Sequence, residues 1–358
     1  MRRLREAMAE RELAAFLSVH PANVRYLTGF TGSSGFLLVG PEVAGLVTDF
    51  RYREQASEEV PDGLPVWIHG DGWREEVAAR LPDVMGEDAG DGSGVGFESD
   101  RVTVRDRERL EDAVPEVRWS GVSGLVEELR SRKSDDEVER IRRAARLGDR
   151  VLESFLDEVV EGATEAELAA ELDYRLRLAG SEGVAFETIV AAGPRSALPH
   201  ASPSGRPLRE GDLVLVDFGA RSGGYCSDMT RVFCLGAPEE WQRSLHRSVL
   251  RAQQAALERV EPGIEAAAVD GAAREALEED GLVEHFGHSA GHGIGLEVHE
   301  EPSVSARSED RLREGHVITV EPGAYLEGRG GVRIEDDVVV RPGGAEVITG
   351  FPRELREL

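Results

Sequence analysis

The stretch from residue 212 to residue 233, DLVLVDFGARSGGYCSDMTRVF, constrains the fold more than any other part of the chain. Two short apolar runs, at 214–216 and 232–234, flank an Arg-Ser-Gly-Gly segment, and glycine tolerates the positive φ of a tight turn. The pattern predicts a β-hairpin. A two-residue turn at Ser222 and Gly223 would place Asp217 directly opposite Asp228, with their Cβ atoms roughly 5 Å apart.

Two facing aspartates repel each other, so a folded protein gains nothing from pairing them bare. One or two divalent cations would convert this repulsion into coordination. A one-residue bulge would shift the register and separate Asp217 from Asp228. The hairpin therefore predicts a cation site at these two residues, provided that its ladder is regular.

The composition is typical of a globular protein with two domains. The chain has 358 residues, of which 40% are hydrophobic, enough for a sizeable core. It contains no apolar run that could span a membrane and no apolar signal-peptide core at its start, so we expect a cytoplasmic protein. Cys226 and Cys234 lie about 26 Å apart on one expected strand, which excludes a disulfide and predicts buried thiols. A role for Cys226 at the site stays open, because it shares a face with Asp228.

The charge of the chain is strongly unbalanced. The formal net charge is -27, and of the 42 basic residues only Lys133 is a lysine. Such a surface repels nucleic acid and anionic lipid, which excludes both as partners. Because the acidic residues are spread along the whole chain, we hypothesise a source that lives at high salt, where ions screen the self-repulsion.

The order of expected elements predicts an α/β (α+β) fold. Short apolar strands alternate with helical patterns in the first third of the chain, which argues for an α/β layer. The Gly/Asp-rich stretch 86–94 is expected to be a surface loop. Ser134 followed by Glu137 has the spacing of a helix capping box and marks the entry to a second domain. We expect a first domain, a linker and a second domain at residues 1–124, 125–136 and 137–358.

The second domain repeats its own outline. After the first hairpin come two helices, a Gly/His-rich stretch and a second hairpin with arms at 316–321 and 332–340. Glu321 and Glu335 lie on opposite arms, and their numbers average to 328, within the turn, so they should face each other approximately. The pattern suggests two pseudo-symmetric halves around one site, without close internal sequence identity.

Five side chains form the candidate metal-ligand set. Four carboxylates and one imidazole suit Mn²⁺, Co²⁺, Zn²⁺ or Fe²⁺. Four negative charges exceed what one ion needs, which favours two ions that activate a bridging water for hydrolysis. Acids in so acidic a chain can be solvated surface groups, but these four lie between hydrophobic strand residues. The set is Asp217, Asp228, His292, Glu321 and Glu335.

Histidines give a second signal. The segment GHSAGHGIGLEVHE contains three of them, and its glycines allow close approach of the backbone to a site. A lone histidine is most often a structural residue, and this is the expectation for His20, His69, His246 and His285. His316 has no evident partner in the sequence.

Several of these segments resemble the signature segments of the pita-bread metallopeptidases, family M24, and occur in the same order. They are LPHASP, DFGARSGGYCSDMTRVF, GHSAGHGIGLEVHE, VITVEPGAY and GGVRIEDDVVV. More narrowly, they resemble the proline-specific branch, Xaa-Pro aminopeptidase (aminopeptidase P) and Xaa-Pro dipeptidase (prolidase). The resemblance extends over nearly the whole chain. It implies a creatinase-like N-terminal α/β domain, a catalytic pita-bread domain of two pseudo-symmetric halves, and a homodimer.

The resemblance also implies roles for single residues. The five candidate ligands match a dinuclear metal site without substitution. His288 and His299 match histidines that bind substrate and stabilise the tetrahedral intermediate, and His200 matches a histidine near the proline-side carbonyl or leaving group. Arg333 matches an arginine that organises the site. Glu321 matches a ligand that also carries the proton from the nucleophilic water to the leaving nitrogen.

We therefore expect a metal-dependent exopeptidase that hydrolyses the N-terminal Xaa-Pro bond of short proline-containing peptides with two divalent ions, Mn²⁺ being the first choice. The main expectation is an aminopeptidase, and a strict Xaa-Pro dipeptidase is the alternative. A metal-free creatinase-like enzyme or a pseudo-peptidase binding module would lack the ligand set. Methionine aminopeptidases usually lack an N-terminal domain of this kind.

Overall fold

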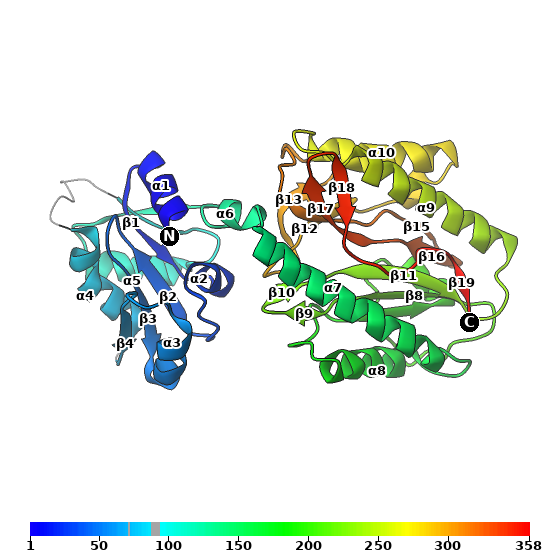
Figure 1. The fold of residues 1–358 in the computed structure, drawn as a ribbon, viewed down its shortest axis with the longest axis horizontal. Coiled ribbons are helices and arrows are strands. Elements are labelled where there is room, and N and C mark those ends of the chain that lie inside the picture. The colour runs from blue at the N-terminus through cyan, green and yellow to red at the C-terminus, as the bar shows by residue number, and fades with distance from the viewer. Residues whose placement is uncertain (71, 87–93) are drawn as a thin grey trace. The chain divides into compact units, whose positions relative to one another are not determined.

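The computed structural model describes residues 1–70, 72–86 and 94–358, and Figure 1 labels its helices and strands. Most of the loop expected at 86–94 lies outside these residues. In the described part of the chain, no helix combines the length and the apolar composition needed to cross a bilayer.

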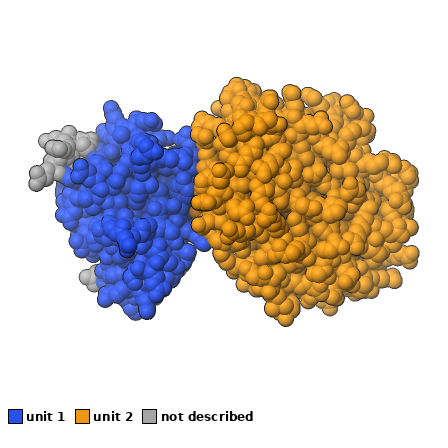
Figure 2. Space-filling view, in the orientation of Figure 1, with its two compact units in different colours: residues 1–130 blue, residues 131–358 orange. Residues whose placement is uncertain are grey.

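The chain divides into two compact units, Met1–Arg130 and Ser131–Leu358, coloured separately in Figure 2. The division falls inside the segment 125–136 that was expected to be a linker. Part of this segment is packed, because Leu125 and Leu129 belong to the apolar core of the first unit. The short helix α6 (Glu127–Ser131) lies at the division.

The first unit is a mixed six-stranded sheet with strand order β4-β3-β2-β1-β5-β6 and helices on both faces, which confirms the expected α/β layer. Alternation along β1 sends Phe16 to one face, with α1, α2 and α3, and Leu17 to the other, with α4 and α5. The elements are α1 (Arg2–Glu10), β1 (Leu13–Ser18), α2 (Pro21–Thr28), β2 (Gly35–Val39), β3 (Ala44–Asp49), a 3-10 helix (Phe50–Tyr52), α3 (Arg53–Glu59), β4 (Val66–His69), α4 (Trp73–Met85), β5 (Gly94–Glu98), α5 (Val104–Ala113) and β6 (Arg118–Val122).

Four long helices flank the strands of the second unit, as Figure 1 shows. The predicted capping box is present at the start of the first of them: the Ser134 side chain accepts from the Glu137 backbone, and the Glu137 side chain accepts in return. The helices are α7 (Asp135–Phe155), α8 (Glu165–Leu178), α9 (Glu240–Arg259) and α10 (Ala266–Glu279), with 3-10 helices at Leu156–Glu158, Gly193–Ala197 and Val283–His285.

The strands of the second unit repeat one arrangement twice. In each half, two helices are followed by a short strand and a hairpin, and the short strand pairs antiparallel with the first hairpin arm. Each hairpin ends in a smaller two-stranded ladder. The main sheets have the orders β19-β11-β8-β7 and β13-β12-β14-β17-β18. This topology matches the expected pseudo-symmetric halves.

The first half contains β7 (Ile189–Ala192), β8 (Leu213–Phe218), β9 (Arg221–Ser222), β10 (Tyr225–Cys226) and β11 (Met229–Cys234). The second contains β12 (Gly291–Gly293), β13 (Glu300–Val304), β14 (Val317–Val320), β15 (Gly323–Leu326), β16 (Gly330–Arg333), β17 (Asp336–Arg341) and β18 (Gly344–Val347). The last strand, β19 (Arg356–Glu357), returns to pair with β11 of the first half.

Candidate metal centre

The first hairpin exists, but its predicted register is wrong. β8 pairs with β11 so that Asp217 lies opposite Thr230 and not opposite Asp228. The tight turn is made by Gly223 and Gly224, one residue later than predicted, and both have positive φ (59° and 84°). This conformation suits the twist of a two-residue hairpin. Because the shift moves the partner by two residues, Asp228 keeps the strand parity that places it on the face of Asp217.

The second hairpin has the predicted register. Val320 of β14 lies opposite Asp336 of β17, and Gly323 of β15 lies opposite Arg333 of β16. The two ladders therefore have the same register. Glu321 and Glu335 lie between these two ladders and therefore oppose each other. This confirms the prediction that the two glutamates face one another.

Strand alternation turns the acids away from the helices. Val216 packs with α7 and α8, so its neighbour Asp217 points to the other face of the first sheet. Val320 packs with α9 and α10, so Glu321 likewise points away from them. The two acid-bearing faces belong to different halves of the unit, and a cavity is lined by acids from both of them.

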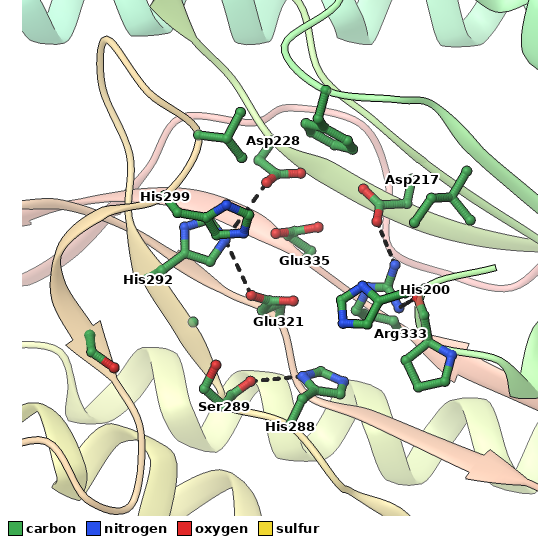
Figure 3. Close-up of a pocket in the computed structure, with 16 residues that line it drawn as sticks. His200, Asp217, Asp228, His288, Ser289, His292, His299, Glu321, Arg333 and Glu335 are labelled. Carbon is green, nitrogen blue, oxygen red and sulfur yellow. Dashed lines mark hydrogen bonds and ion pairs between the residues drawn. The ribbon is translucent and has the colours of Figure 1, made fainter. Parts of the chain in front are cut away.

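All nine predicted site residues line this cavity, which has a volume of about 330 Å³ (Figure 3). They come from several segments between His200 and Glu335, and the fold brings all of them together. The lining also includes four apolar residues, Phe186, Ile189, Pro199 and Val298, and the small residues Ser289, Gly291 and Ser303.

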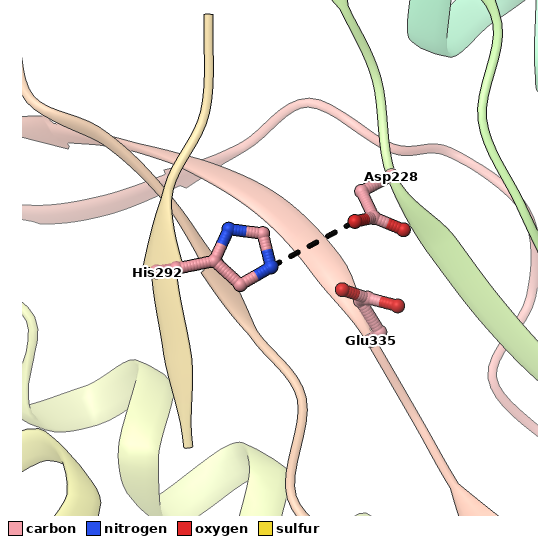
Figure 4. Close-up of side chains that lie close together, drawn as sticks. All are labelled: Asp228, His292 and Glu335. Atoms are coloured by element: carbon pink, nitrogen blue, oxygen red, sulfur yellow. Dashed lines mark ion pairs between the residues drawn. The ribbon is translucent and has the colours of Figure 1, made fainter. Parts of the chain in front are cut away.

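Three of the five candidate ligands form the tightest group. Asp228, His292 and Glu335 each offer a ligand atom within 4.8 Å of the other two (Figure 4). His292 Nε2 lies 3.8 Å from Asp228 Oδ2 and 3.4 Å from Glu321 Oε1. The fifth candidate, Asp217, stands at the other side of the cavity beside Arg333 (Figure 3).

The hydrogen bonding and the burial of His292 suit it to bind a metal ion. Its Nδ1 lies 3.0 Å from the backbone oxygen of Gly293, and a carbonyl oxygen can only accept a hydrogen bond. The proton is therefore on Nδ1, which leaves the lone pair of Nε2 directed at the carboxylates. Burial lowers the pKa of His292, which keeps the ring neutral, as ligation requires.

The carboxylates destabilise one another. Burial raises the pKa of Glu321 to about 7, against the opposing charge of Arg333. The pKa values of Asp228 and Glu335 lie well above their usual range, first because of burial and then because of neighbouring carboxylates. Asp217 Oδ1 and Asp228 Oδ1 are buried without a hydrogen-bond partner among the described residues. Bound cations would satisfy these oxygens and relieve the repulsion, so the donor set fits divalent metal ions.

Arg333 anchors the other side of the cavity. Its Nη2 donates to Asp217 Oδ2 at 2.5 Å, its Nη1 to the Tyr325 hydroxyl at 2.8 Å, and its Nε to Thr230 Oγ1 at 3.1 Å. Thr230 Oγ1 in turn donates to Glu335 Oε2 at 2.6 Å. Arg333 thus orients two carboxylates of the set, one directly and one through Thr230.

The network continues from Tyr325 to His288. His288 Nδ1 faces the Ser289 backbone oxygen at 2.8 Å and must donate to it, so Nε2 accepts from the Tyr325 hydroxyl at 2.8 Å. Burial lowers the pKa of His288 to about 4, so the ring is neutral. Both ring nitrogens are occupied, and a direct bond from His288 to a substrate would require the Tyr325 bond to break.

His299 and His200 are the exposed histidines of the cavity. The ring of His299 packs against that of His292, with centroids 4.3 Å apart. His200 lies on a loop whose two ends are held by one buried carboxylate: Glu165 accepts from the Ala192 backbone at 2.9 Å and from the Ser204 backbone at 3.0 Å. Both histidines can therefore meet a ligand that enters the cavity.

The two cysteines and the other histidines do not line the cavity. Cys226 and Cys234 are buried free thiols, as predicted, and neither lines the cavity. His316, which had no evident partner in the sequence, is buried and accepts from the Arg313 backbone through Nδ1 at 3.3 Å.

Two residues of the site, Tyr325 and Thr230, were not predicted. Thr230 follows Asp228 by two residues, so strand alternation alone places it on the same face. Tyr325 sits diagonally across the β15–β16 ladder from Arg333 and opposite Gly331, where any Cβ would come within 2.7 Å of the tyrosine ring. The paired glycines before Arg333 were the available signal.

Two acid-bearing hairpins from two pseudo-symmetric halves, a neutral and partly buried histidine, and a shared cavity form a donor set that fits divalent metal ions. Residues 139–342 match the model of metallopeptidase family M24, and residues 1–132 match the creatinase/prolidase N-terminal domain. The chain therefore belongs to metallopeptidase family M24 and carries a creatinase/prolidase N-terminal domain. This confirms the resemblance and the expectation of an enzyme.

Full-length relatives support this assignment. A Xaa-Pro dipeptidase of Pyrococcus furiosus is 36% identical over 357 residues, with 99% of each chain covered. The solved Xaa-Pro dipeptidase from Bacillus anthracis is 38% identical, with a TM-score of 0.95 and coverage of 100% of this chain and 98% of that one. The solved X-Pro aminopeptidase from Thermotoga maritima is also 38% identical, with a TM-score of 0.90 and coverage of 98% and 99%.

Proposed function

We propose that the chain is a Xaa-Pro dipeptidase that works with two divalent ions, Mn²⁺ being the first choice. The observation that carries this proposal is the convergence of four carboxylates and a neutral imidazole in one cavity of a family M24 chain. The volume of about 330 Å³ is near the lower end for ligand pockets, which favours a substrate as small as a dipeptide. Two relatives that are similar over their full length, from Pyrococcus furiosus and Bacillus anthracis, are Xaa-Pro dipeptidases.

The proposed ligands are Asp217, Asp228, His292, Glu321 and Glu335. When bound, two divalent ions supply Lewis acidity and activate water as the nucleophile. The carboxylates then need no protons, because the cations compensate their charges.

The other residues act on the substrate and its protons. The nitrogen of a Xaa-Pro bond is tertiary and must be protonated before it leaves, so Glu321 takes the proton of the water and passes it on. His299 and His200 can donate hydrogen bonds to the carbonyl oxygen as negative charge develops there. Arg333 and His288 hold this arrangement through Tyr325.

A second candidate is an aminopeptidase that removes the residue before proline from longer peptides. The similarity to the solved X-Pro aminopeptidase from Thermotoga maritima favours it. The two activities differ in what the cavity does with a chain that continues beyond proline. A dipeptidase must bind the free carboxylate of proline in its cavity, whereas an aminopeptidase must accommodate the residue that follows proline.

Hydrolysis of matched substrates tests the proposal. The purified protein is loaded with Mn²⁺, and cleavage of Ala-Pro, Ala-Pro-Ala and Ala-Ala is followed by release of alanine. We expect cleavage of Ala-Pro alone. Cleavage of the tripeptide at a similar kcat/KM would replace the dipeptidase with the aminopeptidase, and cleavage of Ala-Ala alone would refute both.

We also propose a homodimer, which the resemblance to the family implies. Sedimentation equilibrium of the purified chain tests it directly: a mass twice that of the chain supports the dimer, and a monomer contradicts it.

A further inference from the structure

The only lysine of the chain occupies an unusual place. Lys133 is one of 42 basic residues and the only one that is not arginine. Its side chain is 1% exposed, and its Nζ lies 3.0 Å from Glu300 Oε2, whose side chain is 5% exposed. Most ion pairs of an acidic surface are solvated and contribute little, whereas removing one partner of a buried pair has a large effect.

Glu300 in turn closes a turn of the chain. Its Oε1 accepts from the backbone of Glu297 at 3.1 Å, and the Gly295 backbone donates to the Glu297 oxygen at 3.0 Å. Gly295 has no room for a side chain, because a Cβ there would lie 2.6 Å from Glu300 Oε2. The carboxylate of Glu300 therefore fills the inside of the turn 295–300.

The same turn carries two residues of the cavity wall. Val298 and His299 line the cavity, and the His299 ring rests on His292. The turn is held on its other side by β10, where the Cys226 backbone donates to the Gly295 oxygen at 2.7 Å. The backbone of Lys133 is itself fixed, because it donates to the Gly315 oxygen at 2.7 Å.

We propose that Lys133 is a positioning residue for the reaction: its ammonium group holds Glu300, and Glu300 holds the turn 295–300 so that His299 stays in the cavity wall. Lys133 lines no part of the cavity and does not touch the substrate. The compact ammonium is a point charge that contacts one oxygen of the Glu300 carboxylate, whereas the planar guanidinium of arginine is larger. The proposal deepens the Xaa-Pro hydrolase function and rests on it for the role of His299.

A double-mutant cycle separates positioning from general stability. Lys133→Met removes the charge and keeps a long, unbranched side chain. We expect kcat/KM for Ala-Pro to fall about 10- to 100-fold. This loss should be divided between kcat and KM in the same way as the loss in His299→Ala. Because Lys133 acts through His299, the double variant should lose no more than His299→Ala alone. Independent, multiplicative losses would overturn the proposal.

Arg142→Met is the control for a less buried ion pair of the same region. Arg142 also belongs to the α7 region and pairs with a glutamate, Glu346, at 2.6 Å, but neither residue lines the cavity. Its kcat/KM should stay within about twofold of the wild-type value. An equal loss in both variants would mean that any broken ion pair on or near α7 has this effect, and would overturn the proposal.

Hydrogen exchange tests the anchoring without a substrate. In Lys133→Met, the amides of residues 295–300 should exchange at least about tenfold faster, while the rest of the second unit and the Mn²⁺ content stay unchanged. Glu300→Gln keeps the shape of the turn and should give a smaller effect in the same segment, which covers the case that Lys133→Met does not fold. Unchanged exchange of the amides of residues 295–300 in these variants would overturn the proposal. Failure of the wild-type protein to cleave any Xaa-Pro bond would instead refute the proposed function.

Discussion

Asp228 is the residue on which the metal centre depends most. It belongs to the tight three-residue group, its Oδ1 is buried without a hydrogen-bond partner among the described residues, and its pKa is raised by burial and by neighbouring carboxylates. We predict that Asp228→Asn lowers Mn²⁺ content and Ala-Pro hydrolysis by at least about 100-fold, because an amide cannot replace an anionic ligand. Metal analysis and kinetics check this. Asp62→Asn, at an exposed position, should change neither.

In the absence of bound divalent ions, Asp228→Asn should make the protein more stable. The raised pKa means that ionised Asp228 is costly in the folded state, so removal of its charge relieves repulsion. In EDTA at pH 8, Asp228→Asn should therefore resist urea better than the wild-type protein. Lower stability in EDTA would show that the carboxylates do not repel one another as described.

His246 gives a pH prediction away from the cavity. It is 4% exposed on α9, and burial lowers its pKa to about 4. Unfolded histidine has a pKa of about 6.5, so between pH 6.5 and 4 the unfolded state binds more protons and stability falls as pH falls. His246→Gln removes this loss. Between pH 7 and pH 5, the wild-type protein should lose about 2 kcal/mol more than the variant in urea unfolding, and equal losses would contradict the prediction.

At the scale of elements, the two hairpins show what a sequence can and cannot predict. Glu321 and Glu335 were paired correctly because the midpoint of their numbers falls in a single glycine-rich turn. Asp217 and Asp228 were placed on the correct face but in the wrong register. Ser222-Gly223 and Gly223-Gly224 can both form a two-residue turn, and only the positive φ of both glycines selects the second.

The contacts between hairpins lay beyond sequence reasoning. Thr230 and Arg333 are separated by 103 residues, and neither segment contains a pattern that predicts contact with the other. The nine predicted residues of the lining could be proposed because five of them form a candidate ligand set and the other four lie in segments that resemble the signature segments of the family. Tyr325 lies in one of these segments but was not proposed, since its role depends on where His288 and Arg333 meet it in space.

Thr230 joins the hairpins and gives the prediction that belongs to this scale. Its Oγ1 donates to Glu335 and accepts from Arg333, so it links β11 to the second arm of the second hairpin at two points. Thr230→Val keeps the shape and removes both bonds. We expect Mn²⁺ affinity to fall about 10- to 100-fold, as for other residues that orient metal ligands. Isothermal titration measures this, and Thr230→Ser should restore most of the affinity; an unchanged affinity in Thr230→Val would contradict the link.

The charge of the whole molecule governs its response to salt. Acidic residues number 69 and basic residues 42, so 27 negative charges have no counterpart in the chain. Their repulsion destabilises the compact state, and salt weakens it because the Debye length falls from about 10 Å at 0.1 M to about 3 Å at 1 M. We predict that the free energy of unfolding in urea rises with KCl over this range at pH 7.5.

The sequence pI of about 4.8 provides an internal control for this salt effect. Near pH 5 the net charge is small, so screening has little repulsion left to remove and the dependence on KCl should nearly vanish. Measurements in EDTA at both pH values keep ion binding out of the comparison. A flat response at pH 7.5 would contradict the hypothesis of a high-salt source. Equal slopes at both pH values would mean that KCl acts by exclusion from the surface and not through the charge of the chain.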